Sequence, residues 1–193
     1  MKRSIQRFTL ALLLLLGSTA VLAEDDDYAN TIKVFQDAGQ SGLFFQNAYG
    51  YAVFPTIGKG GIGIGAGHGK GRVYEQGNYV GDTSMTQLTA GLQLGGQAFS
   101  QIIFLENKKA FDDFTSGNFE FGAQASAVAI TAGASAGTST AGGGTAGASV
   151  DKNDASTMGN YHNGVAVFTI AKGGLMYEAT LGGQKFSYKP KKQ

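Results

Sequence analysis

The sequence of 193 residues has no cysteine and no tryptophan, and it has only two prolines and two histidines. Without cysteine the chain forms no disulfide, holds no thiolate-bound metal and cannot carry a lipid on an N-terminal cysteine. His68 and His162 alone make a zinc site or a histidine base a poor expectation. No basic stretch with interleaved aromatic residues occurs, so we expect no nucleic-acid partner.

The first 23 residues have the pattern of a secretory signal peptide. Three basic residues precede an apolar run from Phe8 to Leu16, and the small residue Ala23 offers a cleavage position. We therefore expect an exported protein, periplasmic or secreted, whose residues 24–193 form one domain. Because three of the 15 basic residues lie in this leader, acidic residues outnumber basic ones in the remainder. Any cationic site must then be local.

Glycine is abundant, with 31 residues, and between Gly61 and Gly71 it occupies every second position. Alternate side chains of a strand point to opposite faces, so a strand here would have one face without side chains. On its other face the side chains would change along the strand from the apolar Ile62 and Ile64 to the cations Lys70 and Arg72. Glycine inside a strand marks a place where another backbone, a helix or a ligand comes close.

Periodicity predicts an α+β fold that is mainly antiparallel β. Helical spacing is found at 28–39, 41–48 and 107–114. Strand patterns are found at 49–54, 61–74, 79–82, 86–94, 98–105, 119–131, 164–170, 175–181 and 185–188. Residues 132–149 consist only of Ala, Gly, Ser and Thr, which predicts a loop, with a lid over a site as the alternative. We expect a compact single domain of twisted β-sheet with short N-terminal and central helices.

An internal repeat relates the two halves of this domain. Gly50-Tyr-Ala-Val-Phe54 and Lys59-Gly-Gly61 are matched by Gly164-Val-Ala-Val-Phe168 and Lys172-Gly-Gly174. Continued without gaps, the alignment places Lys185 opposite Arg72. Such a repeat predicts two related hairpins, each with a lysine in a glycine turn. The plainer interpretation, in which these lysines are only solvated turn residues, stays open.

These motifs resemble the SYLF domain, a family of lipid-binding and actin-regulating proteins. The resemblance covers Tyr28 to Tyr188 and is carried by Ala52-Val-Phe-Pro55, Lys59-Gly-Gly61, Gly95-Gly-Gln97 and Lys172-Gly-Gly174. It implies binding of phosphoinositides and other anionic lipids, and in some members binding of actin filaments. Actin is expected here by resemblance only.

A lipid site needs cations that attract phosphate and apolar side chains that enter the interface. The candidate cations are Lys59, Lys70, Arg72, Lys172 and Lys185. The candidate apolar contacts are Phe44, Phe45, Tyr49 and Tyr51. We therefore predict an exported protein that binds anionic phospholipid or phosphoinositide head groups at a membrane surface.

Enzyme motifs are weak in this chain. Gly58 to Gly63 fits a dinucleotide-binding pattern but precedes a strand, and Gly133 to Gly137 fits a nucleophile elbow only within low complexity. We expect no catalysis, no cofactor and no metal. Two other functions stay open: a small outer-membrane β-barrel, suggested by glycine-rich alternating strands after a signal peptide, and a structural envelope protein without a ligand.

Overall fold

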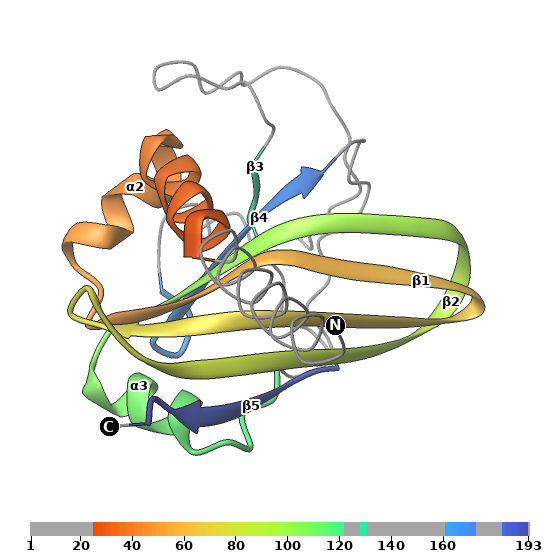
Figure 1. Cartoon of the computed structure of the whole chain (residues 1–193). Helices are drawn as coiled ribbons and strands as arrows, with labels where there is room; N and C mark the ends of the chain where they lie inside the picture. The colour runs from red at the N-terminus through yellow and green to blue at the C-terminus, as the bar shows by residue number, and fades with distance from the viewer. Residues whose placement is uncertain (1–24, 122–127, 131–160, 173–182, 193) are drawn as a thin grey trace, which may run out of the picture.

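A computed structural model of the chain describes residues 25–121, 128–130, 161–172 and 183–192 (Figure 1). The predicted signal peptide, the segment 132–149 and the predicted strand 175–181 lie outside these residues. The helices are an N-terminal helix at 25–37, α2 (Gly39–Gly42), η1 (Leu43–Gln46) and α3 (Lys108–Thr115). The strands are β1 (Gly50–Glu75), β2 (Asn78–Leu105), β3 (Val128–Ile130), β4 (Val165–Lys172) and β5 (Gln184–Pro190). None of the described helices is long and apolar enough to span a bilayer.

The helix predicted at 107–114 is confirmed as α3. Asn107 has extended backbone angles, and its Oδ1 accepts a hydrogen bond from the backbone N of Ala110 at 3.0 Å. This satisfies one of the backbone donors left free at a helix start. Phe111 and Phe114 then lie on the buried side of α3, against the sheet.

β1 and β2 pair antiparallel along their whole length and form a ribbon that folds back on itself (Figure 1). The chain of β1 reverses between Gly61 and Ile64, where a Cβ on Gly61 would overlap the backbone oxygen of Ile64. The two limbs of β1, a first limb at 50–61 and a second at 64–75, then run side by side. A Cβ on Gly71 in the second limb would be 2.8 Å from the oxygen of Val53 in the first. β2 follows the same bend outside β1 (Figure 1). Its first limb, 78–90, pairs with the second limb of β1, and its second limb, 95–105, pairs with the first. The strands predicted at 49–54 and 61–74 are therefore one continuous element.

The two copies of the repeat lie on opposite sides of β2. β1 follows one side of β2, while β4 pairs with residues 98–105 and β5 with residues 81–87 on its other side. Lys59 lies opposite Gln97, and Lys172 opposite the adjacent Ala98, so the copies match in register. The mainly antiparallel α+β fold is confirmed, and the described strands of the two copies flank β2. The connection from β4 to β5 falls outside the described residues, and β3 is parallel to β4.

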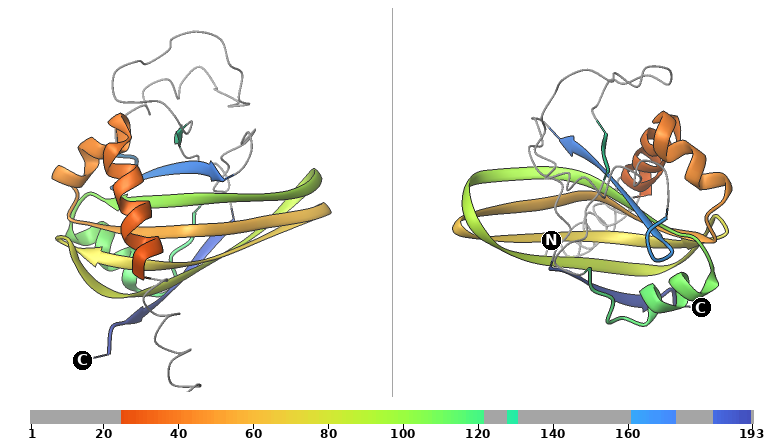
Figure 2. Two further views of the ribbon diagram at one scale, coloured as in Figure 1. Left: turned by 45° about the horizontal axis from the view of Figure 1, so that its top comes forward. Right: turned by 180° about the vertical axis from the view of Figure 1, so that it is seen from behind.

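Each face of the sheet carries part of the core. The inner face packs against α3 and includes Ala52, Phe54, Ile57, Val73, Met85, Ile103, Val167 and Phe186. The outer face packs against the N-terminal helical segments and includes Val53, Ile102, Phe104 and Phe168 (Figure 2). The sheet curls around its inner face. As a result, Gln101 Nε2 of β2 donates to Gln184 Oε1 of β5 at 3.1 Å, although both limbs of β1 and the first limb of β2 lie between these residues in the sheet.

The alternating glycines line the inner face of the second limb of β1. A Cβ on Gly69 would be 2.6 Å from Cγ1 of Ile57, and one on Gly71 would be 2.7 Å from the ring of Phe54. The close approach that the glycine pattern predicts is confirmed, and the neighbour is the other limb of the same strand. The side chains between these glycines consequently point outward.

Candidate functional site

Three neighbouring strands expose polar side chains on the outer face, beyond the area covered by the N-terminal helix. The second limb of β1, the first limb of β2 and β5 run side by side here, in antiparallel register. One row across them is His68, Thr86 and Lys185, and the next is Lys70, Ser84 and Ser187. We call these six residues the outer polar face. It brings together two of the predicted cations, Lys70 and Lys185, which come from the two copies of the repeat.

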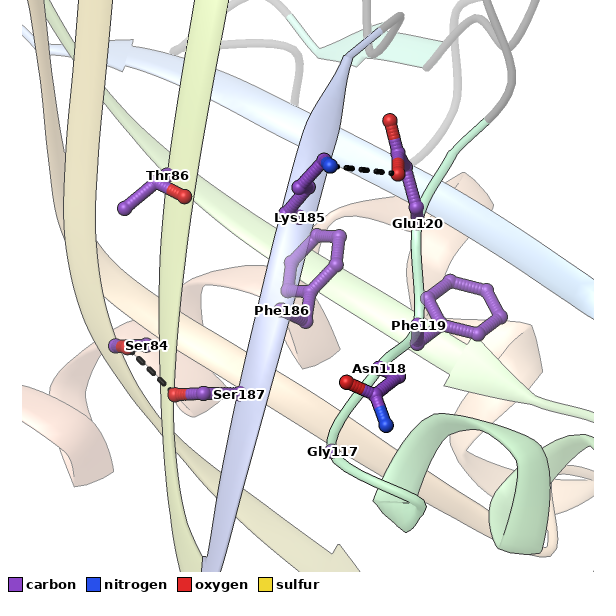
Figure 3. Close-up of a pocket in the computed structure, with 9 residues that line it drawn as sticks. All are labelled: Ser84, Thr86, Gly117, Asn118, Phe119, Glu120, Lys185, Phe186 and Ser187. Carbon is purple, nitrogen blue, oxygen red and sulfur yellow. Dashed lines mark hydrogen bonds and ion pairs between the residues drawn. The ribbon is translucent and has the colours of Figure 1, made fainter.

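A groove runs along the edge of the outer polar face, between β5 and residues 117–120 (Figure 3). Lys185 Nζ and Glu120 Oε2 form an ion pair at 3.2 Å across it. The hydroxyls of Ser84 and Ser187 form a hydrogen bond at 2.7 Å on the β5 side, and Asn118 lies on the opposite side. The hollow has a volume of about 450 Å³. It therefore combines one cation, one anion, hydroxyls and an amide.

Two large apolar side chains are exposed next to the outer polar face. Ile64 is 72% exposed and Leu88 is 74% exposed. Leu88 pairs with Ala66, so Ile64 and Leu88 are diagonal neighbours on adjacent strands. Both strands advance about 3.3 Å per residue, which puts Leu88 roughly 7 Å along the strand from Thr86. Apolar and cationic side chains thus share one face of the sheet.

Arg72 is on the same face, but its charge is already paired. Its guanidinium forms an ion pair with Asp25 and lies 4.3 Å from the ring centroid of Tyr28 and 5.0 Å from that of Tyr79. Burial lowers the pKa of Arg72. The hydrogen bond to Asp25 and the charge of Asp25 raise this pKa by more than burial lowers it, so the net effect is an increase. Arg72 is therefore a charged anchor for the N-terminal helix, and we place it beside the candidate site.

The other two predicted cations lie elsewhere. Lys59 belongs to the inner face and is only 8% exposed, so it cannot meet a membrane surface in this conformation. Lys172 is exposed at the end of β4, where its Nζ donates to Thr56 Oγ1 at 2.8 Å. β4 and the outer polar face flank different limbs of β2.

The predicted apolar contacts serve the core instead. Phe44 and Phe45 pack on Phe104, with ring centroids 5.4 and 4.9 Å away. Tyr51 stacks on Tyr74 at 4.9 Å, and burial raises the pKa of Tyr51 to about 12. These contacts hold the N-terminal helical segments against the sheet.

The hydroxyl of Tyr49 donates to Glu75 Oε1 at 2.6 Å, and this hydrogen bond is the main cause that raises the pKa of Tyr49. Its ring packs on Phe111 with centroids 5.6 Å apart. Tyr49 therefore links the start of β1 to its end and to α3. None of the four predicted aromatic side chains lies on the outer polar face.

Sequence reasoning missed Leu88, Ser84, Thr86, Ser187, Asn118 and Glu120 as members of the site. The signal for Leu88 was alternation within the strand predicted at 86–94, which puts Leu88 on the same side as Thr86. The signal for Glu120 was weaker, because its position depends on pairing with β5 far along the chain.

The family model described as "Las17-binding protein actin regulator" (Ysc84) matches residues 86–192. The chain belongs to this family. The match includes most of β2, all of β4 and β5, and the groove residues Thr86, Asn118, Glu120 and Lys185. The resemblance to the SYLF domain is thereby confirmed, and with it membership of a family linked to lipid and actin binding.

The chain is also similar to a curated bacterial protein, Beta cell expansion factor A of Aeromonas veronii. The two are 28% identical over 157 residues, which are 80% of this chain and 51% of that protein. The chain thus spans about half the length of the curated relative that it matches.

Proposed function

We propose that this protein binds membranes rich in anionic phospholipids through the outer polar face, with Ile64 and Leu88 entering the interface. One observation carries this proposal: the two exposed apolar side chains lie on the same sheet face as Lys70 and Lys185. Leu88 is two residues along β2 from Thr86, the partner of Lys185, and Ile64 is six residues along β1 from Lys70. Peripheral membrane binding requires such a combination of apolar and cationic contacts.

The expected energies suit reversible binding. A lysine near an anionic leaflet contributes about 1 kcal/mol, and complete burial of a leucine or isoleucine side chain contributes about 1.5 to 3 kcal/mol. Lys70 supplies the first contribution, and Lys185 adds less because it forms an ion pair with Glu120. Ile64 and Leu88 supply the second contribution. Because the cations are exposed, salt should weaken the electrostatic part.

The role we infer is binding without catalysis. In the described residues no three His, Asp or Glu side chains gather where they would hold a metal ion. Actin regulation rests on the family description alone. Export to the periplasm or the medium rests on the signal-peptide pattern and remains part of the proposal.

Co-sedimentation of the full chain with neutral and anionic vesicles, at low and high salt, tests the proposal. We expect pelleting with anionic vesicles at low salt and much less with neutral vesicles or at high salt. The double variant Lys70→Glu/Lys185→Glu should lose this pelleting. Lys109→Glu is the matched control, because Lys109 is 85% exposed on α3, away from the outer polar face. Equal pelleting with both vesicle types would contradict the proposal.

A further inference from the structure

We propose that the groove between β5 and residues 117–120 selects lipid head groups that carry a singly charged phosphodiester and free hydroxyls. Phosphatidylglycerol is a head group of this class, and phosphatidic acid, a phosphomonoester, is outside it. This inference rests on the proposed function, because it names the lipid that the same face prefers.

The β5 side of the groove provides the phosphate contacts. Lys185 presents an ammonium with three N–H donors, and its partner on β2 in the same row is Thr86. In the next row, Lys70 lies opposite Ser84, and Ser84 lies opposite Ser187. A phosphodiester in the groove would therefore meet the ammonium of Lys185 and neighbouring hydroxyl donors, while Lys70 lies outside the groove lining, on the far side of Ser84.

The opposite side of the groove makes it selective. Glu120 holds a carboxylate oxygen 3.2 Å from Lys185 Nζ, so the groove itself carries no net charge. A carboxylate only accepts hydrogen bonds, which makes it a good partner for a hydroxyl and a poor neighbour for a second phosphate charge. The amide of Asn118, on the same side, can donate to or accept from a further hydroxyl.

The position and size of the groove agree with this assignment. Its rim at Thr86 is roughly 7 Å along β2 from Leu88, given a rise of about 3.3 Å per residue. If Leu88 enters the apolar boundary of a bilayer, Thr86 and Lys185 reach the level of the head groups. A volume of about 450 Å³ is sufficient for one glycerol phosphate and some water.

Binding to vesicles of equal surface charge, in a neutral lipid background, tests the inference. One set contains phosphatidylglycerol and the other contains phosphatidic acid, with the molar fractions adjusted to match zeta potentials. We expect at least about fivefold tighter binding to phosphatidylglycerol, because only there do hydroxyls reach Glu120. The variant Glu120→Gln should bind phosphatidic acid more tightly and bring the ratio close to one. Asp112→Asn is the control, since Asp112 is an exposed carboxylate paired with Lys108 on α3.

The outcomes separate this inference from the proposed function. Equal binding to both lipids, with no effect of Glu120→Gln, would overturn the head-group selectivity and leave membrane binding intact. Failure to bind any anionic vesicle would overturn the proposed function. Soluble glycerophosphoglycerol serves as a competitor that separates a free diester from a lipid. Its binding to a chain that ignores vesicles would support the groove chemistry and reject the membrane.

Discussion

Single side chains decide which face of this sheet is packed and which is free to bind. Glycines in the second limb of β1 face inward because Ile57 and Phe54 occupy the space that their side chains would need. The residues between them, from Ile64 to Lys70, therefore face outward and are exposed. The glycine face of this limb thus packs in the interior, and the opposite face, which has side chains, carries the candidate site.

Gly71→Ala should destabilise the protein by about 1 to 3 kcal/mol, because the new methyl group would overlap the Phe54 ring and the oxygen of Val53. Urea unfolding followed by circular dichroism measures the change. Gly58→Ala is the matched control in the same strand, since no atom lies within 4 Å of its added Cβ. Equal stability of both variants would show that the two limbs of β1 are not packed as described.

Gln184→Leu should also destabilise the fold, by about 1 to 3 kcal/mol, because it leaves buried amides without partners. Gln184 is fully buried, accepts from Gln101 and donates to Gln87. Thermal unfolding is the measurement, and Lys185→Leu, one residue along and exposed, is the control. A stability loss that is no larger for Gln184→Leu than for Lys185→Leu would argue against a closed inner face.

At the scale of elements, α3 begins as its local sequence predicts, after an N-cap asparagine. Asn107→Ala removes the side-chain acceptor for Ala110 N and should cost about 1 kcal/mol of stability. Asn107→Asp retains an acceptor and should remain near the wild type. Denaturant midpoints compare the two, and a loss of the same size in both would show that the cap is not the cause.

The sequence was sufficient to predict α3, most strands and the repeat, because each depends on local spacing or direct self-comparison. It was not sufficient to predict that β2 follows the bend of β1 and separates the two copies, since that depends on pairing between distant residues. Aromatic residues such as Phe44 and Tyr51 have the same sequence pattern in a core as at a membrane. Only the structure shows that Phe44 packs on Phe104 and that Tyr51 stacks on Tyr74. Glu120 joins the candidate site only through its bridge to Lys185.

At the scale of the whole molecule, one face of the sheet is suited to docking on a membrane. The outer polar face carries Lys70, Lys185 and the exposed pair Ile64 and Leu88, while α3 lies against the inner face. A membrane that contacts this face would meet both copies of the repeat at once. The N-terminal helix, fixed by Arg72 and Asp25, borders the contact area.

A single tryptophan in place of Leu88 tests this docking most directly, because the chain contains no tryptophan of its own. Leu88 is 74% exposed, so Leu88→Trp should fold normally and emit as a solvated indole. Anionic vesicles should shift this emission to shorter wavelength, and brominated acyl chains should quench it, while Lys109→Trp on α3 stays unchanged. An unshifted, unquenched Leu88→Trp signal in protein that pellets with those vesicles would contradict the account.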